Sequence, residues 1–108
     1  MICRFMRLIV FFDLPTLTNK DLIEYRTFRK FLLQNGFIMM QKSVYSKLVL
    51  NGNSSKLMKA KIKKNLPPVG NIELLEVTER QFASIEYLVG NKQSKVIDSF
   101  ERVVEIWC

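Results

Sequence analysis

Five consecutive large apolar residues near the start of the chain, residues 8–12, constrain the fold more than any other stretch. The run is rich in β-branched and aromatic side chains, and its length suits a strand that is covered on both faces in the middle of a sheet. Asp13 follows it directly, and Pro15 cannot donate a ladder hydrogen bond. We therefore predict a central strand over residues 6–12 that ends at an acidic side chain.

The carboxylate of Asp13 has two interpretations from chemistry alone. It is a hard oxygen ligand suited to Mg²⁺, which binds through one or two carboxylates and keeps several waters. One carboxylate per chain is a poor nuclease site, but a symmetric dimer could bring two copies of Asp13 together at its two-fold axis. Alternatively, Asp13 accepts hydrogen bonds from backbone N–H groups near Thr16 and only stabilises the following turn.

The rest of the chain shows alternating helix and strand patterns. Thr18 and Asp21 form a capping pair before a helix with apolar residues at helical spacing, and Gly36 suits its C-terminal end. A second helix ends before Pro67. The candidates for its N-cap are Asn53, Ser54 and Ser55. The further strands are expected at residues 37–40, 43–50 and 72–77.

The expected order is strand, helix, strand, strand, helix, strand. This is the split βαβ or ferredoxin-like arrangement (βαββαβ) of the α+β class, an antiparallel sheet with both helices on one face. Two more strands, expected at residues 85–89 and 102–107, have no place in a four-stranded sheet and would extend an edge or reach a partner. We divide the chain into a ferredoxin-like domain over residues 1–90 and a C-terminal extension over residues 91–108, whose edge strand serves a dimer or partner contact.

The charge of the chain is positive and unevenly distributed. The 108 residues have a net charge of +7. Residues 1–65 hold 13 Lys and Arg against 3 Asp and Glu, a net charge of +10, whereas the remaining residues have a net charge of −3. A basic half of this kind favours a polyanionic partner, with nucleic acid first. The alternative is a solvated basic surface without a specific partner.

Basic residues on the two helices and beside the first strand are candidates for phosphate contacts. Those of the first helix recur at i, i+3 and i+4, so they form a ridge on one side of it. The candidates are Arg4, Arg7, Arg26, Arg29, Lys30, Lys56, Lys59 and Lys63. Such contacts hold the backbone of a duplex without reading its base sequence, and the affinity falls steeply with salt.

Several function classes lack the residues that they need. The chain has no His, which excludes Ser/His/Asp and Cys/His catalysis. It has neither a P-loop nor the aromatic-rich motif of RNA-recognition modules. Cys3 and Cys108 form no close-spaced pair, so we expect reduced thiols in a cytoplasmic protein. No apolar run approaches the length of a membrane span, so we expect no membrane partner.

Several short segments keep a distinctive order and spacing along the chain. They are FFDLPT at residues 11–16, YRTFRKFL at 25–32, GF at 36–37, QKSVYSK at 41–47, GNIELLEVTE at 70–79 and QFA at 81–83. Together they closely resemble the family of small CRISPR-associated adaptation proteins, which is also described as CRISPR-associated endoribonucleases. The resemblance covers about residues 4–90 and is strongest to the branch found with single-effector (type II) systems.

This resemblance implies a ferredoxin-like homodimer that partners the spacer-integrating CRISPR nuclease. The dimer would lie between two integrase dimers, bind the middle of a short duplex protospacer DNA and set the length of the inserted spacer. The family is also described as metal-dependent nucleases on RNA or duplex DNA. Its metal ligand is the Asp at the end of the first strand. The resemblance therefore gives Asp13 a catalytic and metal-binding role, with Mg²⁺ or another divalent cation at the dimer two-fold.

Three functional hypotheses follow, and the first is a DNA-binding scaffold in spacer acquisition. Its integrase contact is assigned to the acidic C-terminal segment, with Val104, Ile106 and Trp107 as candidates, although Trp107 could equally pack in the core of its own chain. The second is a metal-dependent phosphodiesterase centred on Asp13, which is compatible with the scaffold. The third is a toxin-like metal-dependent endoribonuclease outside CRISPR adaptation.

Overall fold

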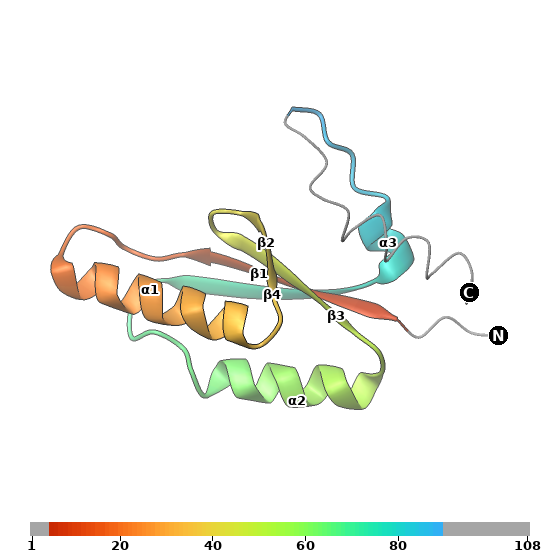
Figure 1. Ribbon diagram of the computed structural model, residues 1–108, viewed down its shortest axis with the longest axis horizontal. Helices are drawn as coiled ribbons and strands as arrows, with labels where there is room; N and C mark the ends of the chain where they lie inside the picture. The colour runs from red at the N-terminus through yellow and green to blue at the C-terminus, as the bar shows by residue number, and fades with distance from the viewer. Residues whose placement is uncertain (1–4, 90–108) are drawn as a thin grey trace.

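The computed structural model describes residues 5–89. In chain order the elements are β1 (Met6–Asp13), α1 (Asn19–Gln34), β2 (Ile38–Gln41), β3 (Val44–Val49), α2 (Gly52–Lys63), β4 (Asn71–Thr78) and α3 (Glu79–Ala83). Helices α1 and α2 lie together on one side of the sheet, and α3 lies near the start of β1 (Figure 1). None of the helices in the described part of the chain is long and apolar enough to cross a membrane.

The four strands form one sheet in the order β2-β3-β1-β4. Each neighbouring pair is antiparallel, and β1 pairs with β4 along its whole length, from Met6↔Thr78 to Asp13↔Asn71. The central position of β1 and the placement of both long helices on one face confirm the predicted ferredoxin-like fold. The described strand is one residue longer than expected, because Asp13 still pairs with Asn71.

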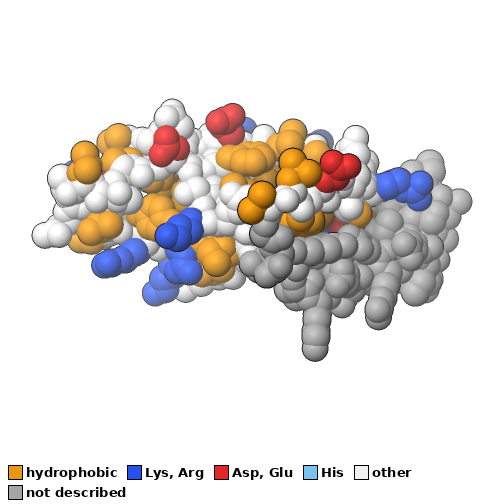
Figure 2. All heavy atoms as spheres, turned by 90° about the horizontal axis from the view of Figure 1, so that it is seen from above, with side chains coloured by type: hydrophobic (Ala, Val, Ile, Leu, Met, Phe, Trp, Pro, Cys, Tyr) orange, Lys and Arg blue, Asp and Glu red, His pale blue; other side chains and the backbone are white. Residues whose placement is uncertain are grey.

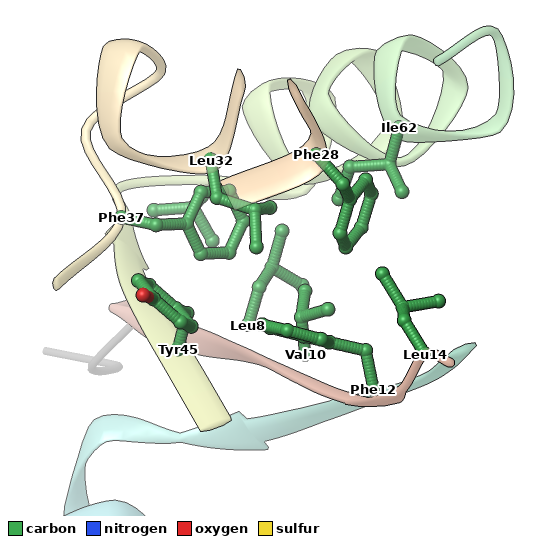
Figure 3. Close-up of a cluster of buried hydrophobic side chains, with 10 residues drawn as sticks. Leu8, Val10, Phe12, Leu14, Phe28, Leu32, Phe37, Tyr45 and Ile62 are labelled. Atoms are coloured by element: carbon green, nitrogen blue, oxygen red, sulfur yellow. The ribbon is translucent and has the colours of Figure 1, made fainter. Parts of the chain in front are cut away.

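The main core lies between the sheet and the two long helices. Alternate side chains of β1, those of Leu8, Val10 and Phe12, point toward Phe28 of α1 and Ile62 of α2 (Figure 3). The rings of Phe12 and Phe28 meet edge to face with their centroids 5.4 Å apart. Burial of each such side chain stabilises the fold by roughly 1.5–3 kcal/mol. This alternation fixes the register of β1, since a slip by one residue would expose the whole set.

The opposite face of the sheet is only partly covered. There Ile9 and Phe82 of α3 form a second, smaller buried cluster, whereas Phe11 is 38% exposed. Figure 2 looks onto this side and shows apolar side chains spread over it, with a few acidic side chains among them. The predicted coverage of residues 8–12 on both faces is therefore wrong at the Phe11 end, because α3 has only 5 residues and covers only the start of the strand.

The starts of the two long helices follow the rules of N-capping. The hydroxyl of Thr18 accepts a hydrogen bond from the Asp21 N–H at 3.1 Å, and the Asp21 carboxylate accepts one from the Thr18 N–H at 3.1 Å, as predicted. Helix α2 is capped instead by Asn51, whose side-chain oxygen accepts a hydrogen bond from the Ser54 N–H at 2.8 Å. The predicted cap within residues 53–55 is wrong, because Asn51 already satisfies the first turn.

The last described segment also differs from the prediction. Residues 85–89 form no strand. Helix α3 ends in a tight turn in which the Ile85 N–H donates to the Phe82 carbonyl at 3.2 Å, and Leu88 is 88% exposed. The apolar spacing here fits a helix as well as a strand, and no strand of the described sheet pairs with this segment. The strand predicted over residues 102–107 lies outside the described residues.

Candidate functional site

Asp13 is the last residue of β1 and lies where the central strand leaves the sheet. It pairs with Asn71 of β4, and its side chain is exposed. Because side chains alternate along a strand, Asp13 lies on the same face as Ile9 and Phe11, opposite the two long helices. We call this the open face of the sheet. The carboxylate is therefore presented beside a half-exposed apolar surface.

Gly70, which directly precedes β4, approaches the backbone of Asp13 closely. Its φ is +113°, and a Cβ at this position would lie 2.5 Å from Leu14 Cδ2 and 3.0 Å from the Asp13 carbonyl oxygen. Only glycine occupies this conformation and this space without displacing its neighbours. The loop between α2 and β4 thus determines where the end of β1 lies.

The carboxylate of Asp13 is available to an external ligand. Within residues 5–89 it makes no hydrogen bond and no ion pair, so the alternative in which it binds backbone N–H groups near Thr16 is not observed. This part of the chain contains no group of three or more His, Cys, Asp or Glu side chains that could hold a metal ion. Asp13 alone, or with one neighbouring carboxylate of the described residues, would leave most positions around Mg²⁺ open. The other ligand oxygens would come from a second copy, from phosphate groups or from water.

Two further oxygen-bearing side chains share the open face with Asp13. Asn71 lies directly opposite it on β4, and Glu73 lies opposite Phe11, which makes Glu73 a diagonal neighbour of Asp13. Diagonal neighbours in an antiparallel pair are about 7–8 Å apart. Both side chains are exposed. Reasoning from the sequence missed them, because their proximity to Asp13 depends on the register between two strands far apart in the chain.

Three of the predicted phosphate contacts are exposed on α1. Arg26, Arg29 and Lys30 all reach solvent. The Nε of Arg29 donates a hydrogen bond to the hydroxyl of buried Tyr45 at 2.9 Å, which holds its guanidinium near the helix surface. The ridge predicted from the sequence is therefore present, and its contact with nucleic acid stays a prediction.

The predicted contacts on α2 fall into two kinds. Lys56 and Lys63 are exposed, whereas the Nζ of Lys59 lies 3.0 Å from the Glu76 carboxylate of β4. The Ser55 hydroxyl donates a hydrogen bond to the same carboxylate. These two hydrogen bonds, with that of Ser55 the stronger, hold the pKa of Glu76 below its usual value. Lys59 is thus paired within the chain, whereas Lys56 and Lys63 form no ion pair with the described residues.

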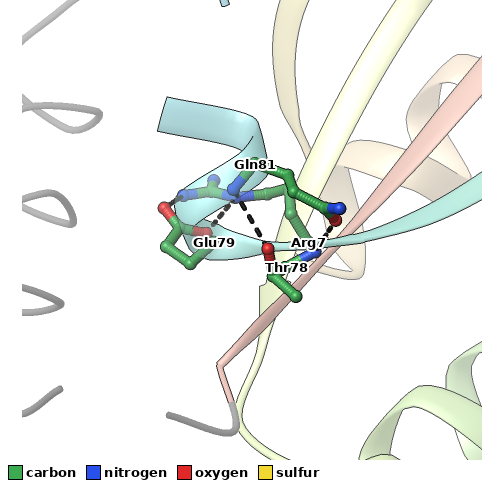
Figure 4. A network of polar contacts seen from close by, with 4 residues as sticks. All are labelled: Arg7, Thr78, Glu79 and Gln81. Carbon is green, nitrogen blue, oxygen red and sulfur yellow. Dashed lines mark hydrogen bonds and ion pairs between the residues drawn. The ribbon is translucent and has the colours of Figure 1, made fainter. Parts of the chain in front are cut away.

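Arg7 is buried, so its assignment as a phosphate contact is wrong. Its side chain has no exposed surface. Its Nε donates a hydrogen bond to Glu79 Oε2 at 2.8 Å, and its Nη2 forms an ion pair with the other oxygen of that carboxylate (Figure 4). The guanidinium carbon lies 4.1 Å from the centroid of the Phe82 ring. The alternation of β1 places Arg7 beneath α3, where the capping box of Thr78 and Gln81 holds the start of the helix.

The remaining predicted site residues lie outside the described part of the chain. They are Arg4 and the three partner-contact candidates Val104, Ile106 and Trp107. Their assignments stay predictions.

Comparison with known proteins supplies the family. The family model of CRISPR associated protein Cas2 matches residues 6–85. A relative from Treponema denticola is 48% identical over 99 residues, which cover 92% of this chain and 98% of the relative. One from Streptococcus mutans UA159 is 52% identical over 99 residues, covering 92% and 91%. One from Lacticaseibacillus rhamnosus is 40% identical over 101 residues, covering 94% and 100%.

All three relatives carry the name CRISPR-associated endoribonuclease Cas2. The match spans the whole ferredoxin-like sheet, both long helices and Asp13. The chain therefore belongs to the Cas2 family of CRISPR-associated proteins.

Proposed function

We propose that this chain acts as a homodimer in CRISPR spacer acquisition, binding duplex protospacer DNA and bridging dimers of the integrase nuclease. Membership of the Cas2 family supports a role within a CRISPR system. The observation that carries the DNA-binding part is the basic solvent side of the two long helices. Exposed Arg26, Lys30, Lys56 and Lys63 supply charge there.

The composition of α2 favours a phosphate backbone as its partner. The helix contains 12 residues, among them Lys56, Lys59, Lys61 and Lys63, and it contains no Asp or Glu. A lysine ammonium is a compact charge on a flexible stem, so it contacts phosphates without demanding one base sequence. This suits a protein that binds many different protospacers.

The open face of the sheet supports the homodimer. Phe11 is 38% exposed and Leu75, which pairs with Ile9 and so shares the face, is 48% exposed. Packing of this face against a second copy would remove these side chains from water. Because the interface of a two-fold dimer uses the same patch on both copies, Asp13 of each copy would enter the same interface.

The dimer would also carry a metal-dependent endonuclease activity on RNA or DNA. Mg²⁺ or another divalent cation, held by the two Asp13 carboxylates, would supply positive charge that stabilises a reacting phosphodiester. The contribution of this chain is a carboxylate that makes no bond within the described residues and whose backbone is positioned by Gly70. The name endoribonuclease on the similar proteins supports this activity.

The test is a paired assay on the wild type and Asp13→Ala, purified identically. One arm follows cleavage of RNA and duplex DNA with Mg²⁺, and the other follows spacer acquisition with the partner integrase. We expect the variant to lose cleavage but to keep its dimer, DNA binding and acquisition. Retained cleavage by the variant would show that Asp13 does not hold the catalytic metal. Loss of acquisition by a folded, DNA-binding dimer would show that cleavage belongs to the acquisition reaction.

A further inference from the structure

A groove of about 430 Å³ separates the C-terminal end of β3 from α2. The residues that carry the argument are Lys47, Leu48, Leu50, Leu57, Met58 and Lys61. Leu50 is 58% exposed and Leu57 is 65% exposed, although both are large apolar side chains. Neighbouring exposed leucines in a concave site are typical of a binding surface rather than of a solvated helix.

One wall of the groove is a strand edge that lacks a partner in the described chain. The pairing of β2 with β3 stops at Ile38↔Ser46, whereas the pairing of β3 with β1 continues to Val49. The Phe12 N–H donates to the Ser43 carbonyl at 3.0 Å. Since hydrogen-bonded and non-hydrogen-bonded pairs alternate, the backbone groups of Leu48 point away from β1, toward this free edge. An unpaired edge of this kind can accept an added strand.

The rim of the groove is basic. Lys47 and Lys61 contribute to its lining, and among the described residues no Asp or Glu does. The ammonium of Lys47 donates to the Asn35 carbonyl at 2.7 Å, which uses one of its three N–H donors and holds the charge in place. An occupant that complements this groove therefore carries acidic groups as well as apolar ones.

We propose that this groove binds an extended, acidic segment of a partner protein, which adds a strand to the free edge of β3 and packs apolar side chains against Leu57. The extended form follows from the backbone groups of Leu48, and the acidic character follows from Lys47 and Lys61. Duplex DNA fits less well, because its phosphates give Leu50 and Leu57 nothing to pack against. The groove lies on the helix side of the sheet, away from the open face proposed for the second copy.

The experiment uses the full chain and a labelled ten-residue peptide with Leu and Glu in turn at every second position and Thr between them, so that both kinds of side chain face α2 when the peptide is extended. Binding is followed by fluorescence anisotropy. Leu57→Asp is expected to weaken binding by about tenfold or more, as loss of a central apolar anchor does. Leu17→Asp is the matched control, because Leu17 is 94% exposed, comes after the C-terminal end of β1 and does not line the groove. The same peptide with Lys in place of Glu is expected to bind poorly to the wild type and better to Lys61→Glu.

Amide hydrogen exchange gives a second readout at Leu48. Its amide is expected to exchange rapidly in the free protein and to slow when the Glu/Leu peptide is added. Three outcomes would overturn the proposal: equal peptide affinity of the wild type and Leu57→Asp, a Leu48 amide already protected in the free chain, or DNA binding that itself requires Leu57. Equal affinity would show that the peptide binds outside the groove. A protected Leu48 amide would show that this chain or a second copy already fills the groove, and a need for Leu57 in DNA binding would assign the groove to nucleic acid. Asp13→Ala is expected to bind the peptide normally, so failure of the proposed nuclease function leaves this test unaffected.

Discussion

The Ser55 hydroxyl on α2 donates a hydrogen bond to the Glu76 carboxylate on β4. Ser55 is buried, and Lys59, one helical turn further along, adds an ion pair to the same carboxylate. β4 is an edge strand of the sheet, so its outer side has no ladder in the described chain. The polar contact therefore joins α2 to a strand that would otherwise be held only by β1 and by apolar packing.

Glu76→Gln is expected to lower the free energy of unfolding at pH 7 by about 1 kcal/mol, mostly through the weakened hydrogen bond with Ser55. The ion pair with Lys59 adds little, because both side chains are about one third exposed and solvent screens them. The pKa of Glu76 is lower in the folded chain than the usual value of 4.5. Its contribution is therefore complete above that value and is lost as the pH falls through the folded pKa.

Urea unfolding of the wild type and Glu76→Gln at pH 7 and at low pH measures this effect. The difference between the two proteins should shrink as Glu76 becomes protonated. Glu73→Gln is the control, since Glu73 is exposed on the same strand. A difference that stays constant with pH would contradict the role of the Glu76 charge.

Removal of either partner of the buried pair Arg7 and Glu79 is expected to cost about 3–5 kcal/mol, because the other charge is left buried and uncompensated. Both side chains are fully buried. Arg7→Met and Glu79→Leu combined should be markedly less destabilising than the sum of the two single changes. A double-mutant cycle by urea unfolding measures the coupling. Additive single effects would show that the two charges act independently.

Gly70→Ala is expected to destabilise the chain by about 1–3 kcal/mol, because its backbone is held in a conformation that alanine rarely adopts. The φ of Gly70 is +113°, and the added Cβ would collide with Leu14. Gly52→Ala is the matched control. A Cβ at Gly52, the first residue of α2, meets nothing within 4 Å, so stability should stay equal or rise by up to about 1 kcal/mol. Thermal unfolding of the two variants measures the effect. Equal changes in their stability would contradict the role of the Gly70 backbone conformation.

Combined replacement of Lys56 and Lys63 by Gln is expected to reduce the salt dependence of duplex DNA binding by about two units of log–log slope, one for each lost phosphate contact. Both lysines are exposed, whereas Lys59 is paired with Glu76. Lys59→Gln should therefore change the slope less than either neighbour. Anisotropy titrations of a labelled duplex at several salt concentrations measure the slopes. An unchanged slope in the double variant would place the DNA elsewhere on the molecule.

The order of the elements could be predicted because local signals mark each of them. The unbroken apolar run over residues 8–12 marks the central strand, and Thr18 with Asp21 marks the start of α1. These signals depend on residues a few positions apart in the sequence, so they can be recognised without knowledge of the fold. The same local reasoning was wrong at the cap of α2, because Asn51 competes with three good caps that follow it within four residues.

The site was only partly predictable, because its decisive contacts join distant residues. The position of Asp13 at a strand end is a local feature and was predicted correctly. The burial of Arg7 depends on Glu79, which lies 72 residues further along the chain, so a basic residue beside a strand was taken for a surface residue. The free edge at Leu48 likewise depends on the shortness of β2, and no pattern within residues 43–50 reveals it.

The buried Arg7 and the exposed Asp13 belong to the same strand. They are six residues apart, which corresponds to about 20 Å along an extended strand. Strands β3 and β4 pair with β1 on both sides, and the ion pair between Arg7 and Glu79 joins α3 to the start of β1. Because the ladder between β1 and β4 is continuous from Met6 to Asp13, β1 fixes the distance between the buried ion pair and the exposed carboxylate.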